Sequence, residues 1–284
     1  MKKFFIWCMK LLVLFAVLAV GLYWFAGYTP SETEPVRGPQ TTKEQQIESS
    51  EDQLTRTDRI YRLFHFQEAV EQALDKRVPP SQRVKGDAIS EDLKKALVAT
   101  EDKRYYEHGA IDAFGIARAF YTNVTAGETL EGGSTITQQL VKNLFLSSKR
   151  IMSRKVEEVI LAYLMEYYYT KDEILAMYLN TIYYGNNYYG IKQASEGYFD
   201  TAPADLTLGQ SALMAGMPQA PTYYNPLTNY KAAKARQRTV LNLMAQQNII
   251  TPSEADKAYY SDLHLTKPLT DVDIDKNERG GTIE

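Results

Sequence analysis

Residues 153–169, SRKVEEVILAYLMEYYY, decide the fold class. Apolar side chains recur in this stretch at the 3.6-residue spacing of an α-helix: Val156, Val159, Ile160, Tyr163, Leu164 and Tyr167. This spacing predicts a helix over 153–169 that buries this stripe in the core. The opposite face mixes charged and apolar side chains: Arg154, Glu158, Leu161, Ala162 and Met165. Such a face is unlike a solvated one, so we expect it to line a cleft.

Helix-start signals recur along the sequence after Arg59. Threonines followed three residues later by Glu or Gln form these pairs: Thr170 with Glu173, Thr207 with Gln210, and Thr251 with Glu254. In a capping box of this kind, the two side chains bond backbone N–H groups that the first turn leaves without partners. Alternating strand-like runs are few, and no internal repeat is present. We therefore expect a mainly α-helical domain over 59–262 and a polar tail over 263–284.

The composition excludes several classes of protein. The chain has 284 residues, of which 44% are hydrophobic and 24% charged, as in a globular protein. Its formal net charge of -3 gives no overall positive field, so nucleic acid is not expected as a partner. Cys8 is the one cysteine, which rules out an intrachain disulfide framework and a cysteine zinc site.

The first residues predict a membrane anchor. No charged residue occurs in 11–31, and with 4–9 in front the apolar stretch reaches the roughly 20 residues that a spanning helix needs. Lysines cluster at its N-terminal end: Lys2, Lys3 and Lys10. Because positive charge favours the cytoplasmic side, we expect a single-pass helix within 1–28 and the remainder of the chain outside the cell membrane.

A cleaved signal peptide is the alternative to this anchor. The apolar stretch is long for a signal peptide, and bulky Tyr23, Trp24 and Phe25 stand where a small-residue cleavage site is required. Residues 29–58 are rich in Pro, Thr, Ser, Gln and Glu, which is typical of a solvated stalk.

A local cluster of cations stands out in a chain of negative net charge. No acidic residue occurs in 132–156, where these cations fall: Lys142, Lys149, Arg150, Arg154 and Lys155. Most of them precede or occupy the first turn of the helix expected over 153–169, where the helix dipole already disfavours positive charge. An anion such as pyrophosphate would relieve this repulsion. The alternative is that the cations face water or anionic lipid headgroups.

A glycine-rich turn precedes these cations. Residues 131–139 read EGGSTITQQ and offer hydroxyl and amide groups that could hold sugar or phosphate oxygens. A turn of this composition is also an ordinary helix cap, so both interpretations stay open at this point.

A second polar cluster, ATEDKRYYEH, occupies residues 99–108. Glu101 and Asp102 end an apolar helical run over 93–99, so their carboxylates are candidates for acid or base catalysis. A cap or a salt bridge is the alternative role. His108 is a candidate structural residue, because the other two histidines of the chain complete no metal-binding motif with it.

Taken in order, these clusters resemble the family 51 peptidoglycan glycosyltransferases, which occur as membrane-anchored enzymes and fused to transpeptidases in penicillin-binding proteins. The resemblance runs from about residue 89 to 260. Its main pieces are Glu101-Asp102 with Arg104, Tyr106 and His108; 132–139 with Lys142-Asn143; Arg154-Lys155 with Glu158; and 171–180, KDEILAMYLN.

This resemblance implies a lysozyme-like, two-lobed helical domain that polymerises lipid II into glycan strands. It assigns Glu101 as the base that deprotonates the acceptor 4-hydroxyl, with inversion at the anomeric carbon as the lipid pyrophosphate departs. Glu158 is implied as a second catalytic residue. The implied substrate-binding residues are Ser134, Thr135, Gln138, Gln139, Lys142, Arg150, Arg154 and Lys155. A divalent metal, Mg or Mn, is a candidate cofactor with no assigned ligands.

The sequence departs from the family pattern in its first motif. Tyr105 stands where the family has Phe, and the glycine after His108 is shifted by one place, so that Ala110 stands where glycine is usual. If this position needs a positive φ, Ala110 would strain the loop. Residues 59–83 match no family motif, although a helix is expected over 67–74.

The motifs that the sequence lacks bear on its expected partners. It holds no Ser-x-x-Lys, Ser-x-Asn or Lys-Thr-Gly set, so no transpeptidase domain is expected in it. A penicillin-binding transpeptidase or cell-wall elongation proteins are therefore expected partners, beside lipid II, the growing glycan chain and the membrane. A lytic transglycosylase is the rival enzyme, although it needs no pyrophosphate site. A scaffold without activity is the rival that is not an enzyme.

Overall fold

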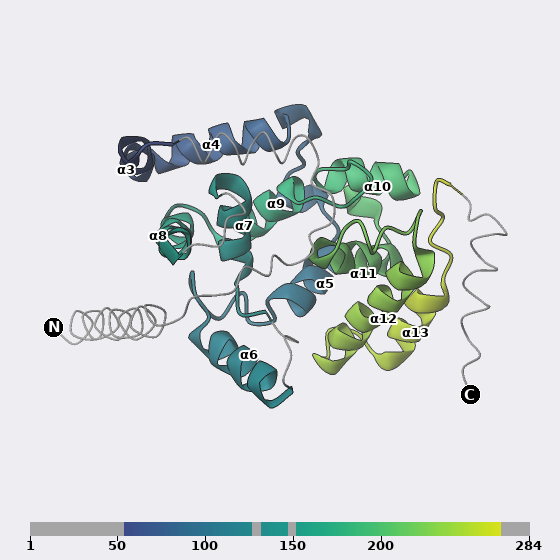
Figure 1. Ribbon diagram of the computed structural model, residues 1–284. Helices are drawn as coiled ribbons and strands as arrows, with labels where there is room; N and C mark the ends of the chain where they lie inside the picture. The colour runs from purple at the N-terminus through teal and green to yellow at the C-terminus, as the bar shows by residue number, and fades with distance from the viewer. Residues whose placement is uncertain (1–53, 127–131, 147–151, 268–284) are drawn as a thin grey trace. The chain divides into compact units, whose positions relative to one another are not determined.

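The computed structural model describes residues 54–126, 132–146 and 152–267, and these are mainly α-helical (Figure 1). The α-helices are α3 (Arg56–Phe64), α4 (Phe66–Arg77), α5 (Glu91–Glu101), α6 (Ala113–Ala126), α7 (Ile136–Phe145), α8 (Met152–Tyr168), α9 (Lys171–Thr181), α10 (Ile191–Phe199), α11 (Leu208–Gly216), α12 (Tyr230–Gln246) and α13 (Pro252–Tyr260). Short 3-10 helices are η1 (Pro80–Gln82), η2 (Gly86–Ala88), η3 (Pro203–Asp205) and η4 (Met217–Gln219). Within the described ranges the only β-pairing is an isolated bridge between Tyr183 and Tyr189.

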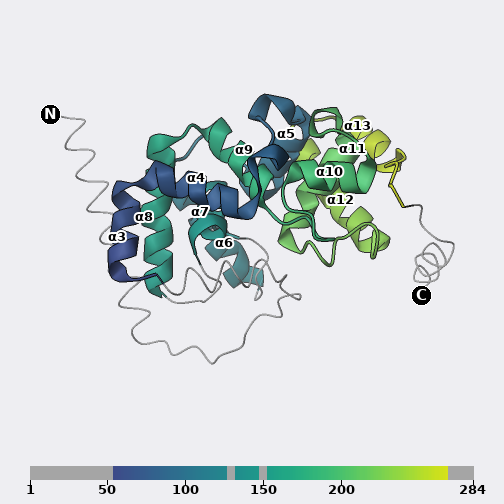
Figure 2. The same ribbon diagram turned by 90° about the horizontal axis from the view of Figure 1, so that it is seen from above.

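The helices of the domain pack in neighbouring sets. Helix α5 packs against α11 and α12, and α12 also packs against α13. Helix α7 packs against α8, α9 and α4 (Figures 1 and 2). Leu93 and Leu97 of α5 and Leu140 of α7 are fully buried, so the core continues through both sets. The C-terminal end of α5 carries Glu101, the N-terminal half of α7 carries Gln138 and Gln139, and α8 carries Arg154, Lys155 and Glu158.

The expected helix starts are confirmed. Capping boxes at Thr170, Thr207 and Thr251 open α9, α11 and α13, each with its threonine hydroxyl accepting from the backbone N–H of the expected Glu or Gln. Two further boxes begin α3 and α7, at Thr55 and Thr135. The helix expected over 67–74 is part of α4.

The predicted orientation of the helix over 153–169 is wrong. Helix α8 forms there, but the mixed face is the buried one: Glu158 is 3% exposed and Leu161, Ala162 and Met165 are fully buried. The stripe predicted as core instead holds exposed residues, namely Ile160, Tyr163 and Tyr167. Both faces of this helix are apolar, so periodicity located the helix but could not tell which face its neighbours would cover.

The predicted flanking segments are only partly described. The expected anchor, 1–28, lies outside the described residues. Helix α3 begins at Arg56, inside the stretch expected to be stalk, 29–58. Leu263, in the expected tail, is buried and its carbonyl accepts from Gln210 Nε2 at 3.0 Å. None of the helices in the described ranges is long and apolar enough to cross a bilayer.

Candidate active site

Glu101 is held at the end of α5 by a side chain from α7. The amide Nε2 of Gln139 donates to Glu101 Oε2 at 3.0 Å. In the described part of the chain the other carboxylate oxygen, Oε1, has no hydrogen-bond partner. Burial raises the pKa of Glu101 above its ordinary value, although the Gln139 hydrogen bond and the Arg236 charge oppose the rise. One anchored oxygen, one oxygen open to a ligand, and a raised pKa are the properties of a general base.

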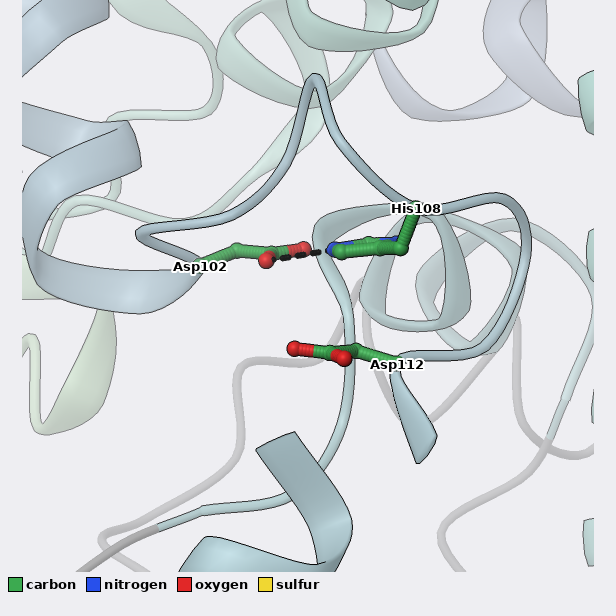
Figure 3. A group of neighbouring side chains, drawn as sticks. All are labelled: Asp102, His108 and Asp112. Carbon is green, nitrogen blue, oxygen red and sulfur yellow. Dashed lines mark hydrogen bonds and ion pairs between the residues drawn. The ribbon is translucent and has the colours of Figure 1, made fainter. Parts of the chain in front are cut away.

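Asp102, the next residue, ties three segments together. Its Oδ1 pairs with His108 Nε2 at 2.7 Å, and its Oδ2 accepts from the backbone N–H of Ile136 at 3.1 Å. Figure 3 shows the Asp102 and His108 side chains facing each other with Asp112 beside them. Asp102 therefore joins the end of α5, the loop carrying His108 and the first turn of α7, which fixes Gln139 relative to Glu101.

His108 carries a positive charge in this arrangement. Its Nδ1 lies 2.6 Å from the Gly109 carbonyl and its Nε2 faces Asp102, so both partners are acceptors and both ring nitrogens must carry a hydrogen. Burial alone lowers the pKa of His108, but the hydrogen bonds to Asp102 and Gly109 outweigh it and raise the pKa above its ordinary value. The nearby Lys171 opposes the rise. The structural role expected for His108 is the one observed.

Asp102, His108 and Asp112 form a candidate metal site, but their contacts do not favour a metal ion. Ligand atoms of Asp102, His108 and Asp112 lie within 4.8 Å of one another. However, both Asp102 oxygens and both His108 nitrogens already have partners, and the Arg104 guanidinium lies 3.4 Å from Asp112 Oδ1. A divalent cation would have to displace a proton and approach an arginine. The cluster therefore fits an ion-paired imidazolium better than Mg or Mn.

The glycine-rich turn ends in a helix cap. The Thr135 hydroxyl accepts from the Gln138 backbone N–H, and Gln138 Oε1 accepts from the Thr135 N–H at 3.0 Å. Both side chains are buried, and the Thr135 hydroxyl also lies 2.9 Å from the Ala110 carbonyl, to which it donates. The capping alternative is thus confirmed for Thr135 and Gln138, while their contact with substrate stays a prediction. Ser134, one residue earlier, is exposed.

The first turns of α8 bring a cation, an acid and this serine together. Lys155 forms an ion pair with Glu158, and its Nζ also donates to Ser134 Oγ at 3.4 Å. The Lys155 side chain is 44% exposed, whereas that of Glu158 is buried. Glu158 therefore orients a lysine that reaches solvent beside the turn. Arg154 on α8 and Lys142 on α7 are half-buried. Arg150 lies outside the described residues.

The expected strain at Ala110 is absent. Positive φ among the described glycines is found at Gly185 and Gly190, and neither Gly109 nor Ala110 has one. Ala110 is buried, and its carbonyl accepts the Thr135 hydroxyl. The shifted glycine therefore costs the loop no backbone strain. Tyr105 is also accommodated, because its buried hydroxyl donates to the Lys171 carbonyl at 2.7 Å.

Two groups that support the site could not be predicted from the sequence. The Tyr178 hydroxyl donates to Gln139 Oε1 at 2.9 Å. Glu166 Oε1 accepts from the Thr137 hydroxyl at 2.5 Å and from Lys171 Nζ at 2.7 Å, which joins α7, α8 and the start of α9. Tyr178 and Lys171 both fall in 171–180, which the resemblance included, but no spacing rule indicates that their side chains turn toward α7.

This chain is similar to known proteins. A sequence profile described as Transglycosylase matches residues 68–245. Penicillin-binding protein 1A of Neisseria flavescens is 45% identical over 181 residues, covering 64% of this chain and 23% of that protein. Penicillin-binding protein 1F of Bacillus subtilis strain 168 is 45% identical over 167 residues, covering 59% of this chain and 23% of that protein. The crystal structure of penicillin-binding protein 1A from Haemophilus influenzae matches 65% of this chain and 18% of that one, with 24% identity and a TM-score of 0.40.

The matched region contains the whole candidate site. The chain spans 23% of the length of both curated relatives, and the profile runs across α5, α7, α8 and α9, including Glu101, Gln139 and Glu158. A match over more than half of the chain, on these residues, shows that the chain belongs to the transglycosylase family, the peptidoglycan glycosyltransferases of family 51.

Proposed function

We propose that this protein polymerises lipid II into glycan strands by inverting glycosyl transfer, with Glu101 as the general base. One observation carries the proposal: a buried carboxylate of raised pKa has one oxygen anchored by Gln139 and the other without a partner among the described residues. A base of this kind removes the proton of the acceptor 4-hydroxyl as that oxygen attacks the anomeric carbon on the face opposite the leaving group. Base catalysis contributes about a hundred- to ten-thousand-fold to the rate.

The departing lipid pyrophosphate would be held by the cations of α7 and α8. Lys155 bridges Glu158 and Ser134 at the exposed edge of α8, and Lys142 and Arg154 lie on the same two helices. We assign these residues, together with Arg150, to the pyrophosphate, because preorganised cations stabilise charge that develops in the transition state. Glu158 acts by holding Lys155 in place. Ser134, Thr135, Gln138 and Gln139 are assigned to the donor side.

No catalytic step is assigned to a metal. A divalent ion, if bound, would supply further positive charge to the pyrophosphate. We do not place the ion at Asp102, His108 and Asp112, because Asp102 and His108 already bond protein partners and the Arg104 guanidinium lies 3.4 Å from Asp112 Oδ1.

The cellular setting is part of the proposal. The apolar segment within 1–28 would anchor the protein in the cell membrane with the catalytic domain outside, and the domain would adopt the two-lobed lysozyme-like arrangement of its family. The sequence holds no transpeptidase motif, so we propose that this chain does not crosslink and works beside a penicillin-binding transpeptidase or cell-wall elongation proteins.

The direct test is polymerisation of labelled lipid II by detergent-solubilised protein, followed on a gel. Wild type should give a ladder of glycan products and Glu101→Gln should give none, because the amide cannot take the proton. Glu91→Gln, on the same helix at an exposed position paired with Lys94, is the matched control and should keep full activity. Bound lipid II with no ladder from wild type would instead support a scaffold, and release of sugar from finished glycan would support a lytic enzyme.

A further inference from the structure

The hydroxyl of Tyr178 begins a chain of hydrogen bonds that ends on Glu101. It donates to Gln139 Oε1 at 2.9 Å, and Gln139 Nε2 donates to Glu101 Oε2 at 3.0 Å. Tyr178 is 1% exposed and belongs to α9, Gln139 to α7 and Glu101 to α5, whose positions Figure 1 shows. These two hydrogen bonds therefore form only when the three helices pack together.

The orientation of the Gln139 amide decides which form of Glu101 it supports. An ionised carboxylate can only accept hydrogen bonds, so it needs the NH₂ side of the amide, whereas a protonated carboxyl can donate to the carbonyl side. An amide that can turn over serves both forms. An amide held with NH₂ toward Glu101 favours the carboxylate.

Tyr178 prevents the amide from turning. The phenol oxygen could accept from a turned amide, but the phenol hydrogen would then be buried without an acceptor, because the described residues offer this hydroxyl no partner besides Gln139. A buried donor without a partner is costly. Burial also raises the pKa of Tyr178 well above its ordinary value, so the hydroxyl keeps its hydrogen at neutral pH.

We propose that Tyr178 is a positioning residue for the catalytic base: its hydroxyl locks the Gln139 amide so that Glu101 stays an anchored carboxylate with one oxygen left for the acceptor hydroxyl. This inference rests on the proposed function of Glu101 and extends it to a residue that does not touch the reacting atoms.

Few other charges act on Glu101. From the helices packed against α5, Arg236 of α12 favours the ionised form, and α11 contains no titratable side chain. Asp102, next to Glu101 in the chain, disfavours the ionised form. None of these groups depends on the Tyr178 hydroxyl, so its removal changes only the amide that faces Glu101.

The test is the pH profile of lipid II polymerisation by full-length Tyr178→Phe. Without the Tyr178 hydrogen bond to Gln139, the acid limb of the kcat/KM profile should move to higher pH by about one unit. At pH values on the acid limb, kcat/KM should therefore be about tenfold lower than in the wild type. Activity should return toward the wild-type value at high pH, with KM for lipid II little changed. An equal loss at every pH, or an unmoved limb, would overturn the proposal.

Two buried tyrosines supply matched controls. The Tyr184 hydroxyl has no hydrogen-bond partner among the described residues, so Tyr184→Phe removes a buried hydroxyl without breaking a hydrogen bond. The Tyr198 hydroxyl donates to the Tyr184 carbonyl at 2.9 Å, so Tyr198→Phe removes a buried hydrogen bond that involves neither Gln139 nor Glu101. Both variants should leave the acid limb where it is. A shift in either would show that general loosening, not the Gln139 lock, moves the limb.

A second variant keeps the test decisive if Tyr178→Phe folds poorly. Gln139→Met removes the amide itself and should also shift the acid limb upward, and adding Tyr178→Phe to it should shift the limb no further. Additive shifts would overturn the proposal.

Wild type and Glu101→Gln are measured in the same assay. A wild type that makes no polymer overturns both the proposed function and this inference. An active wild type with an unmoved acid limb in Tyr178→Phe overturns only the positioning role.

Discussion

At the scale of single residues, the site depends on supporting side chains that each make two hydrogen bonds. One carboxylate oxygen of Asp102 pairs with His108, and the other accepts from a backbone N–H in the first turn of α7. The Thr135 hydroxyl accepts a hydrogen bond as the cap of α7 and donates one to the Ala110 carbonyl. Tyr105, which replaces the usual Phe, places its extra hydroxyl on the Lys171 carbonyl, and Lys171 Nζ in turn lies 4.4 Å from the centre of the Tyr105 ring. Departures from the family pattern are thus absorbed locally and leave Glu101 unaffected.

The protonated His108 predicts a specific dependence of stability on pH. Since its pKa is raised in the folded state, its contribution is fully present below its ordinary pKa of about 6.5 and is lost as pH rises through the folded value. His108→Gln should therefore destabilise most in mild acid, and the difference from wild type should shrink toward alkaline pH. Urea unfolding across this range measures it, with exposed His264→Gln as the control. A difference that stays constant with pH would contradict the charged state.

At the scale of elements, α8 shows what a pattern can and cannot decide. Both of its faces are apolar, yet it buries Leu161 and Met165 and exposes Tyr167. The buried face packs toward α7 and α9 and carries Glu158, whose charge is accepted in the interior because Lys155 pairs with it. The orientation of α8 thus places Lys155, one of the pyrophosphate candidates, beside Ser134.

The orientation of α8 can be tested by truncating one residue on each face. Leu161→Ala should lower the free energy of unfolding by about 2–5 kcal/mol, because it leaves a cavity in the core. Tyr167→Ala, at a site 79% exposed, should change it by about 0.5 kcal/mol or less. Urea unfolding of both variants measures the contrast. The reverse order of effects would mean that the stripe of 153–169 is the buried face after all.

At the scale of the whole molecule, side chains join segments far apart in sequence. Asn180, at the end of α9 and 4% exposed, accepts from the Val84 backbone N–H at 2.8 Å and donates to the Val84 carbonyl at 2.8 Å. This pairing fixes the connection between α4 and α5 against α9. Gln247, after α12, likewise donates to the Ala99 carbonyl at 2.9 Å, close to Glu101. The site is therefore supported by contacts from both ends of the domain.

Loss of the hydrogen bonds between Asn180 and Val84 should lower the unfolding free energy of the whole domain. Asn180→Ala leaves the Val84 N–H and C=O without their side-chain partner, and we expect a loss of about 3 kcal/mol of unfolding free energy. Asn229→Ala, which removes only the local cap of α12, should cost about 1 kcal/mol. Chemical denaturation compares the two. Equal losses would show that the long-range pairing adds nothing to a local contact.

The sequence by itself determined the helical class and the capped helix starts, because capping and periodicity act between residues a few positions apart. The candidate catalytic residues were assigned from the resemblance of ordered motifs to the family. The sequence also located the cation cluster and Glu101 through their order along the chain. Only the tertiary structure decided which face of α8 is buried, that Ala110 is unstrained, and that Tyr178 reaches Gln139. These features depend on which helices come together in space, and the energies that bring them together arise between segments that no local pattern connects.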